Sequence, residues 1–187
     1  CPYPMCEAET IVYGCTDASA LNYDSNATSD DESCEYFSEE LTNALSLQGI
    51  IDFTVPSGGS SGKAIHLYAN GDIADLSLFA LGIANNGGGT DSIEYILDSI
   101  SVNAGDDILI VRSDSVMNLY FGECYSNFEH VLIGNNNISQ NGDDAVELYE
   151  LGVVIDTFGD IDTDGTGEAW EYLDSWAYKV GEEWTYG

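Results

Sequence analysis

The sequence predicts an all-β protein, a β-sandwich or a barrel, with a small disulfide-stapled module before it. Two observations carry this prediction. From about residue 47, short runs of β-forming residues alternate with turn residues, and no helical periodicity separates them. Before that point, four of the five cysteines fall within the first 34 residues, a density typical of small stapled modules.

The N-terminal module is predicted to span residues 1–36. This stretch contains no lysine or arginine and has little apolar periodicity, so it buries little surface. Disulfides, with or without a metal ion, must therefore order it. A zinc site is disfavoured, because the cysteine spacings lack a paired C-x2-C set and histidines nearby.

The cysteines of the module allow three pairings, and the sequence alone does not choose among them. We expect Cys15 to pair with Cys34 and Cys1 with Cys6. Cys124 then remains, either buried and free or paired with one of the N-terminal cysteines. Disulfides persist in oxidising compartments, so we expect the protein to be extracellular or at a cell or virion surface.

Residues 37–46 are predicted to be a linker or a short helix, for which Ser38 is a suitable N-cap. The larger domain is predicted to span residues 47–187, and its strands are short and bounded by Gly- and Asn-rich turns. The strands we expect are Ile50–Val55, Ala64–Ala69, Ile93–Leu97, Asp107–Val111, Val116–Phe121, His130–Ile133, Ala145–Tyr149 and Val153–Phe158.

The composition excludes several classes of function. With 3 Lys and Arg against 34 Asp and Glu, the formal net charge is −31, which argues against binding to nucleic acid or to an anionic membrane surface. No run of about 18 apolar residues occurs, so membrane insertion is not expected. Hydrophobic residues make up 44% of the chain and aromatic residues 11%, which is enough for a folded core.

The larger domain resembles a lamin-tail domain, and several motifs in the same order carry the resemblance. They are Lys63–Asn70, Ile73–Ser77 with Leu81, Asn141–Leu148, Val154–Asp160, Trp170–Tyr172 and Ser175–Lys179. The resemblance implies an immunoglobulin-like β-sandwich. The chain departs from the pattern at His66, where an acid is usual, and at Lys179, where an arginine is usual. The last strand of the pattern is cut short after Trp184–Gly187.

The N-terminal segment is similar to a short acidic cysteine module found in surface and secreted proteins of marine bacteria and in some of their viruses. The matching motifs are Gly14–Asp17, Asn22–Tyr23 and Asp30–Cys34, in which Glu32 stands where a glycine is usual. Neither resemblance implies a catalytic residue.

A calcium-loop pattern begins at Asp160. It places Asp160, Asp162, Asp164, Glu168 and Glu171 at positions 1, 3, 5, 9 and 12, with a glycine at position 6. Oxygen ligands on a turning backbone are what calcium requires. The alternative is a solvated acidic loop, because no helix pattern precedes Asp160 and a chain this acidic produces such spacings readily.

A second candidate calcium site lies in the N-terminal module. Its oxygen-bearing residues are Asp17, Asp24, Asn26, Asp30 and Asp31. A stretch without cations repels itself unless a bound cation relieves the repulsion. The alternative is that these side chains point to water and that disulfides alone hold the loop. Calcium is therefore the one cofactor that the sequence suggests.

Enzyme signatures are weak. Only His66 and His130 are available as histidine bases, and neither a His-Glu-x-x-His nor a Gly-x-Ser-x-Gly motif occurs. We therefore expect no enzymatic activity. The aromatic residues of one segment could instead form a patch for sugar rings, although we expect at least two of them to be core residues. They are Tyr120, Phe121, Tyr125 and Phe128.

Two functions from different classes fit the sequence. The first is a non-enzymatic, calcium-stabilised binding or adhesion module of a surface or secreted protein, with a protein or glycan partner at the cell surface. The second is a structural subunit of an extracellular assembly, such as a filament, surface layer or virion decoration, which acts by self-association through strand edges. A third and weaker interpretation is an appendage of a secreted nuclease or phosphatase.

Overall fold

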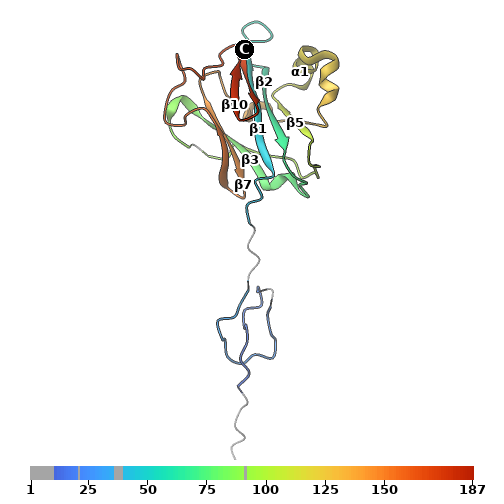
Figure 1. The fold of residues 1–187 in the computed structure, drawn as a ribbon, viewed down its shortest axis with the longest axis vertical. Helices are drawn as coiled ribbons and strands as arrows, with labels where there is room; N and C mark the ends of the chain where they lie inside the picture. The colour runs from blue at the N-terminus through green and yellow to red at the C-terminus, as the bar shows by residue number, and fades with distance from the viewer. Residues whose placement is uncertain (1–10, 21, 36–39, 91) are drawn as a thin grey trace, which may run out of the picture. The chain divides into compact units, whose positions relative to one another are not determined.

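The chain forms two compact units, Cys1–Glu40 and Leu41–Gly187 (Figure 1). This computed structural model describes residues 11–20, 22–35, 40–90 and 92–187. In the first unit a disulfide joins Cys15 to Cys34, as predicted. The predicted Cys1–Cys6 pair lies outside the described residues.

Of the two structures predicted for residues 37–46, a linker or a short helix, the helix is not formed in the part of this segment that is described. Residues 40–44 have no helical structure, and a strand begins at Leu45. Ser38 is a plausible N-cap because acidic residues follow it in the sequence. Further along, however, Leu45 and Leu47 are both buried. Alternation of buried and half-buried positions from Leu45 onward favours a strand, because it turns one face toward the core.

The second unit is mostly β, and its described strands form two sheets. A six-stranded sheet has the order β10-β9-β1-β2-β5-β6, and a four-stranded sheet has the order β4-β3-β7-β8. The strands are β1 Leu45–Phe53, β2 Gly62–Ala69, β3 Phe79–Ala84, β4 Tyr95–Ile96, β5 Asp107–Val111, β6 His130–Ile133, β7 Ala145–Glu150, β8 Val153–Phe158, β9 Ser175–Val180 and β10 Glu183–Tyr186.

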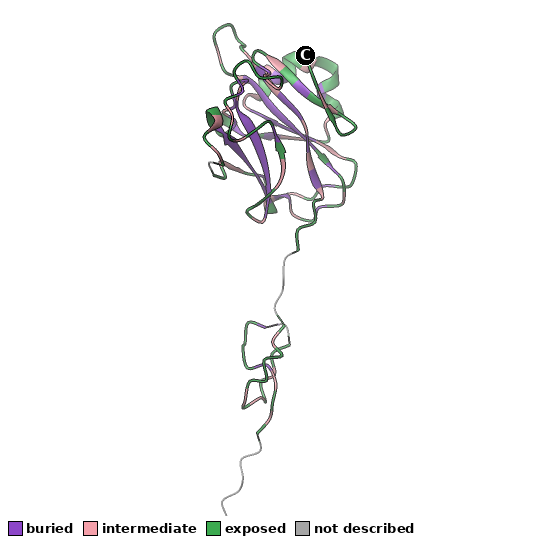
Figure 2. Cartoon of the chain, turned by 60° about the vertical axis from the view of Figure 1, so that its left-hand side comes forward, coloured by how far each residue is buried: buried purple, intermediate pink, exposed green. Residues whose placement is uncertain are grey.

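The core lies between the two sheets, which is the β-sandwich-like arrangement that the alternating runs predict. Figure 2 shows the buried residues along the strands of both sheets. Ile50, Ile65 and Ile110 contribute from the larger sheet, and Leu81 and Leu148 from the smaller one. Adjacent side chains on these strands point the other way, so the larger sheet also has an outer face.

The helix α1, Asp114–Phe121, replaces the strand that was predicted for Val116–Phe121, so that prediction is wrong. A short apolar run does not distinguish a helix from a strand by its pattern. The topology decides here, because β5 and β6 are parallel and parallel neighbours need a crossover connection. Helix α1 and the 3-10 helix η3, Gly122–Asn127, supply that connection.

A second, smaller core lies between this crossover and the outer face of the six-stranded sheet. It contains Ala64, Leu109 and Val111 from the sheet and Met117 and Tyr125 from the crossover. The crossover therefore covers the β2, β5 and β6 side of that outer face, and it reaches β1 through the contact of Tyr120 with Phe53. Of the described helices, none is long and apolar enough to cross a membrane.

The other predicted strands agree with the structure to different degrees. The bounds predicted for Asp107–Val111, His130–Ile133 and Val153–Phe158 match β5, β6 and β8. Strand β3 is absent from the prediction, as are β9 and β10. Every residue of β3 is buried, so its sequence lacks the alternation that marks a half-exposed strand.

Candidate functional site

The acids proposed as calcium ligands in the first unit hold local turns. Each accepts a hydrogen bond on Oδ1 from the backbone N–H two residues further along, with N to O distances of 2.9 to 3.1 Å. Asn26 also donates its side-chain amide to Asp24, at 3.1 Å. Such turns order a short chain without a core. The four acids are Asp17, Asp24, Asp30 and Asp31.

The acids of the predicted Asp160 loop behave in the same way between β8 and β9. Asp160 accepts hydrogen bonds from the backbone of Asp162, at 3.0 Å, and from the hydroxyl of Thr163, at 3.0 Å. Asp164 accepts one from Thr166 N, also at 3.0 Å, and hydrogen bonds from Thr166 hold the pKa of that carboxyl below its usual value.

Glu171, the last acid of the loop pattern, accepts a hydrogen bond from the backbone N–H of Gly167, at 3.1 Å. Glu168 donates its own backbone N–H to the carbonyl of Gly165, at 2.9 Å. In the part of the chain that the structure describes, no three His, Cys, Asp or Glu side chains are grouped so that they could hold a metal ion. Calcium therefore stays a prediction at both places.

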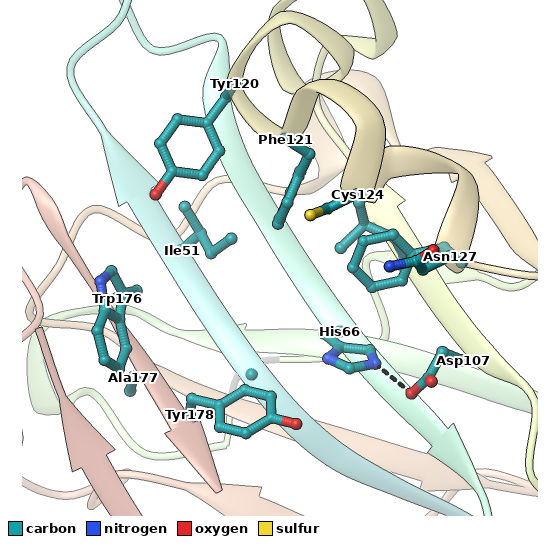
Figure 3. A pocket seen from close by; sticks show the side chains of 13 residues that line it. Ile51, His66, Asp107, Tyr120, Phe121, Cys124, Asn127, Trp176, Ala177 and Tyr178 are labelled. Carbon is teal, nitrogen blue, oxygen red and sulfur yellow. Dashed lines mark hydrogen bonds and ion pairs between the residues drawn. The ribbon is translucent and has the colours of Figure 1, made fainter.

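An open groove lies on the outer face of the six-stranded sheet, and its volume is about 450 Å³. It occupies the part of that face that the crossover leaves uncovered (Figure 3). Its floor comes from β1, β2 and β5, one wall from α1 and η3, and the other wall from β9. Its lining residues are Gly49, Ile51, His66, Asp107, Leu109, Tyr120, Phe121, Cys124, Asn127, Phe128, Trp176, Ala177 and Tyr178.

Gly49 creates the floor of the groove. It pairs with His66 of β2 on one side and with Tyr178 of β9 on the other. The register of β1 shifts between Leu47 and Gly49, and such a bulge re-aims the side chains that follow it. Because Gly49 has no side chain, the rings of His66 and Tyr178 stack across it, with their centroids 6.1 Å apart.

The wall from the crossover is aromatic. Phe121 packs edge to face against Phe128, with ring centroids 5.3 Å apart, and Phe128 packs the same way against His66 at 5.1 Å. Tyr120 lies at the outer end of this wall and is 53% exposed. Three of the four aromatic residues that the sequence suggested for a sugar-binding patch therefore line the groove. The fourth, Tyr125, is buried in the smaller core.

The opposite wall presents Trp176 and Tyr178 from β9. These residues are 36% and 43% exposed, so each leaves ring surface accessible to a ligand. They alternate with Ala177, which is buried in the main core, so the period of the strand sends both rings to the outer face. Figure 3 shows them across the groove from Tyr120 and Phe121.

The polar groups of the groove gather at one end, around His66 and Asp107. The Nε2 atom of His66 lies 2.7 Å from Oδ1 of Asp107. Burial lowers the pKa of His66 below 6.5, and the hydrogen bond and charge of Asp107 oppose this shift only in part. The His66 side chain is 11% exposed and that of Asp107 38%. The end of the groove therefore holds a neutral imidazole beside an accessible carboxylate.

Cys124 also lines the groove, and its thiol is free in the described structure. It is exposed, so the expectation of a buried thiol is wrong. Within the described residues, the hydrogen bond of His66 leads to Asp107 and does not reach Cys124. The groove thus contains a thiol, an imidazole and a carboxylate without the hydrogen-bonded chain that activates a nucleophile.

Sequence reasoning missed most of this site. The sequence marks His66 only as one of two histidines available as a base and as a departure from the lamin-tail pattern, and it gives no site prediction for Gly49, Trp176 or Tyr178. The signal that was available is the exposed face of the strand Ser175–Val180, where tryptophan and tyrosine alternate with alanine. What the sequence does not show is the register that brings these residues to the same floor.

Comparison of the chain with known protein families, with curated proteins and with solved structures found no match of any of the three kinds. The class of protein is therefore defined by its fold and its groove alone. It is a mostly β, two-sheet protein with an aromatic groove on the outer face of the larger sheet.

Proposed function

We propose that this chain is a non-enzymatic, extracellular binding or adhesion module, and that its groove binds a stretch of a glycan chain. The observation that carries the proposal is the pair of facing aromatic walls above a floor that Gly49 leaves open. The Cys15–Cys34 disulfide supports an oxidising, extracellular location. We further propose that the larger unit is an immunoglobulin-like, lamin-tail-like domain, and that calcium stabilises the protein.

The chemistry of the groove suits sugar rings. Pyranose rings have apolar C–H faces that pack on aromatic side chains, and hydroxyl groups at their edges that need hydrogen-bond partners. Trp176, Tyr178 and Tyr120 offer exposed ring surface, and Asp107 and Asn127 offer polar atoms. The volume of about 450 Å³ lies within the range of small-molecule sites.

The proposal is tested by titrating neutral oligosaccharides of several linkages into the protein by calorimetry. Tyr178→Ala should weaken binding about tenfold, as expected for a loss of ~1.4 kcal/mol. The matched control is Tyr68→Ala, because Tyr68 is on the same sheet, is 37% exposed and lies outside the groove. Equal effects of the two substitutions, or no binding of any oligosaccharide, would contradict the proposal.

Filling the floor gives a second, independent variant. A Cβ at Gly49 would meet its nearest neighbours at 3.4 Å, so Gly49→Ala fits locally and places a methyl group on the floor of the groove. We expect binding to be lost while the thermal unfolding temperature changes little. Gly71→Ala is the control, because its Cβ would meet only Ala44, at 3.6 Å.

A third experiment locates the binding site. Bound ligand should protect Cys124 from alkylation, which peptide mass spectrometry measures.

The second candidate function is a structural subunit, and the edge of the smaller sheet favours it. In the described structure β8 pairs only with β7, and its residues Val153 and Val154 are 50% and 37% exposed. An edge strand with exposed apolar residues can pair with a second chain. The molar mass in solution separates the two candidates.

A further inference from the structure

We infer that the groove selects sugars that carry a protonated amine, with neutral sugars second, and that it excludes acidic sugars. This inference rests on the proposed function and specifies its ligand. It depends on the charges that line the groove and on those that lie elsewhere.

Asp107 is the charged side chain of the groove lining. The hydrogen bond between Nε2 of His66 and Oδ1 of Asp107 fixes the Asp107 carboxylate in place at the polar end of the groove. A second carboxylate lies close by, because Glu129 accepts a hydrogen bond from the backbone N–H of Asp107 at 2.8 Å. An ammonium group at this end would gain a charge-assisted hydrogen bond in a partly desolvated place.

The cations of the chain are all engaged elsewhere. Lys63 is buried in contact with Asp52, and Lys179 lies 3.4 Å from Asp156. Arg112 donates to the carbonyl of Ile138 at 3.0 Å and to Asn136. A sugar carboxylate or sulfate in the groove would therefore meet aromatic faces and Asp107 with no counter-charge. It would also approach a molecule with a net charge of −31.

The aromatic walls act in the same direction. The face of an aromatic ring carries partial negative charge and attracts a cation, most strongly when the ring is tryptophan. Tyr178 presents such a face beside His66 at the polar end of the groove, and Trp176 lies further along the same wall. A ligand that is both a pyranose and a cation would thus use both kinds of contact.

The test compares three oligosaccharides of the same length and β1,4 linkage, built from glucosamine, N-acetylglucosamine or uronic acid. We expect the amino sugar to bind about tenfold more tightly than the neutral one, and the acidic one not to bind. Asp107→Asn should bring the affinities for the amino and the neutral oligosaccharide to the same value, because the ratio between them depends on the carboxylate. Rising salt should reduce the amine advantage, because Asp107 is partly exposed.

Glu183→Gln is the matched control. It removes the same unit of charge from the exposed strand β10, outside the groove, and should keep the advantage of the amine. Equal affinity for amino and neutral sugars would overturn this inference and leave the proposed function standing. So would an amine advantage that survives Asp107→Asn or that Glu183→Gln also abolishes. Failure of every neutral and amino oligosaccharide to bind would overturn both.

Discussion

His66 is a largely buried histidine whose pKa burial lowers. A histidine whose pKa is lowered in the folded state binds its proton more readily after unfolding. Its contribution to stability is therefore fully present above the unfolded value of 6.5 and is lost as the pH falls through the lowered folded-state pKa. Asp107 limits the shift, because its carboxylate favours the charged imidazole.

The prediction is that acidification below pH 6.5 destabilises the wild type more than it destabilises His66→Gln. The measurement is the free energy of unfolding in urea across this range. His130→Gln serves as control, because His130 also pairs with a carboxylate, that of Asp106 at 3.1 Å, but lies outside the groove. If His66→Gln and the wild type lose stability in parallel, the ring is not desolvated in the folded protein.

At the scale of elements, a buried ion pair joins β1, β2 and the segment before β7. The ammonium of Lys63 on β2 contacts Asp52 on β1 and the carbonyl of Gln140. Both charged side chains are 7% exposed. Gln140 also donates to the carbonyls of Ile51 and Ala64, so the three segments share a single polar cluster.

Lys63→Met should cost about 3–5 kcal/mol of unfolding free energy, because it leaves the carboxylate of Asp52 buried without its partner. The comparison variant is Lys179→Met, whose partner Asp156 has a side chain that is 22% exposed. That change should cost about 1 kcal/mol or less. Midpoints of urea unfolding, at constant slope, give both values. Equal losses would show that burial does not distinguish the two pairs.

The strands and helices also show how much of the fold can be predicted from the sequence. Strand β7 can be predicted because apolar and polar residues alternate in its sequence, although all of its residues are buried, and the cysteine density indicates a stapled module without choosing the Cys15–Cys34 pairing. Strand β3 cannot be predicted in this way, because its sequence contains no polar residue to alternate with the apolar ones. The segment Val116–Phe121 is helical because two parallel strands need a crossover, which is a property of the sheet and not of the segment.

The groove illustrates the same limit. Tyr120, Phe121 and Phe128 are close in the chain, so their common role could be predicted from composition. The opposite wall begins at Trp176, 48 residues after Phe128, and Gly49 connects the two walls only through strand register. Long-range pairing of this kind is set by the packing of the whole domain, which no local pattern reveals.

For the whole molecule, the net charge of −31 sets the expected behaviour in solution. Like charges oppose close association of copies unless salt or a bound cation screens them. We therefore expect light scattering to give the mass of a monomer, 20.1 kDa, both in calcium and in a chelator.

We also expect calcium to raise the thermal unfolding temperature, because binding to the folded state stabilises it.

A large assembly in calcium that collapses in chelator would instead establish the structural subunit. An unchanged unfolding temperature would contradict the calcium prediction without affecting the groove. If calcium stabilises the protein, Asp164→Asn and Asp24→Asn separate the two candidate sites, because each removes one carboxylate from only one of them.

The crossover between β5 and β6 has a consequence for how such a protein diversifies. One wall of the groove is a single insertion between two neighbouring strands, and its own small core attaches it to the sheet. Exchanging this segment would change ligand preference while leaving the main core between the sheets intact. The crossover can therefore vary in sequence, and with it the ligand specificity of the groove, while the two sheets and the core between them stay the same.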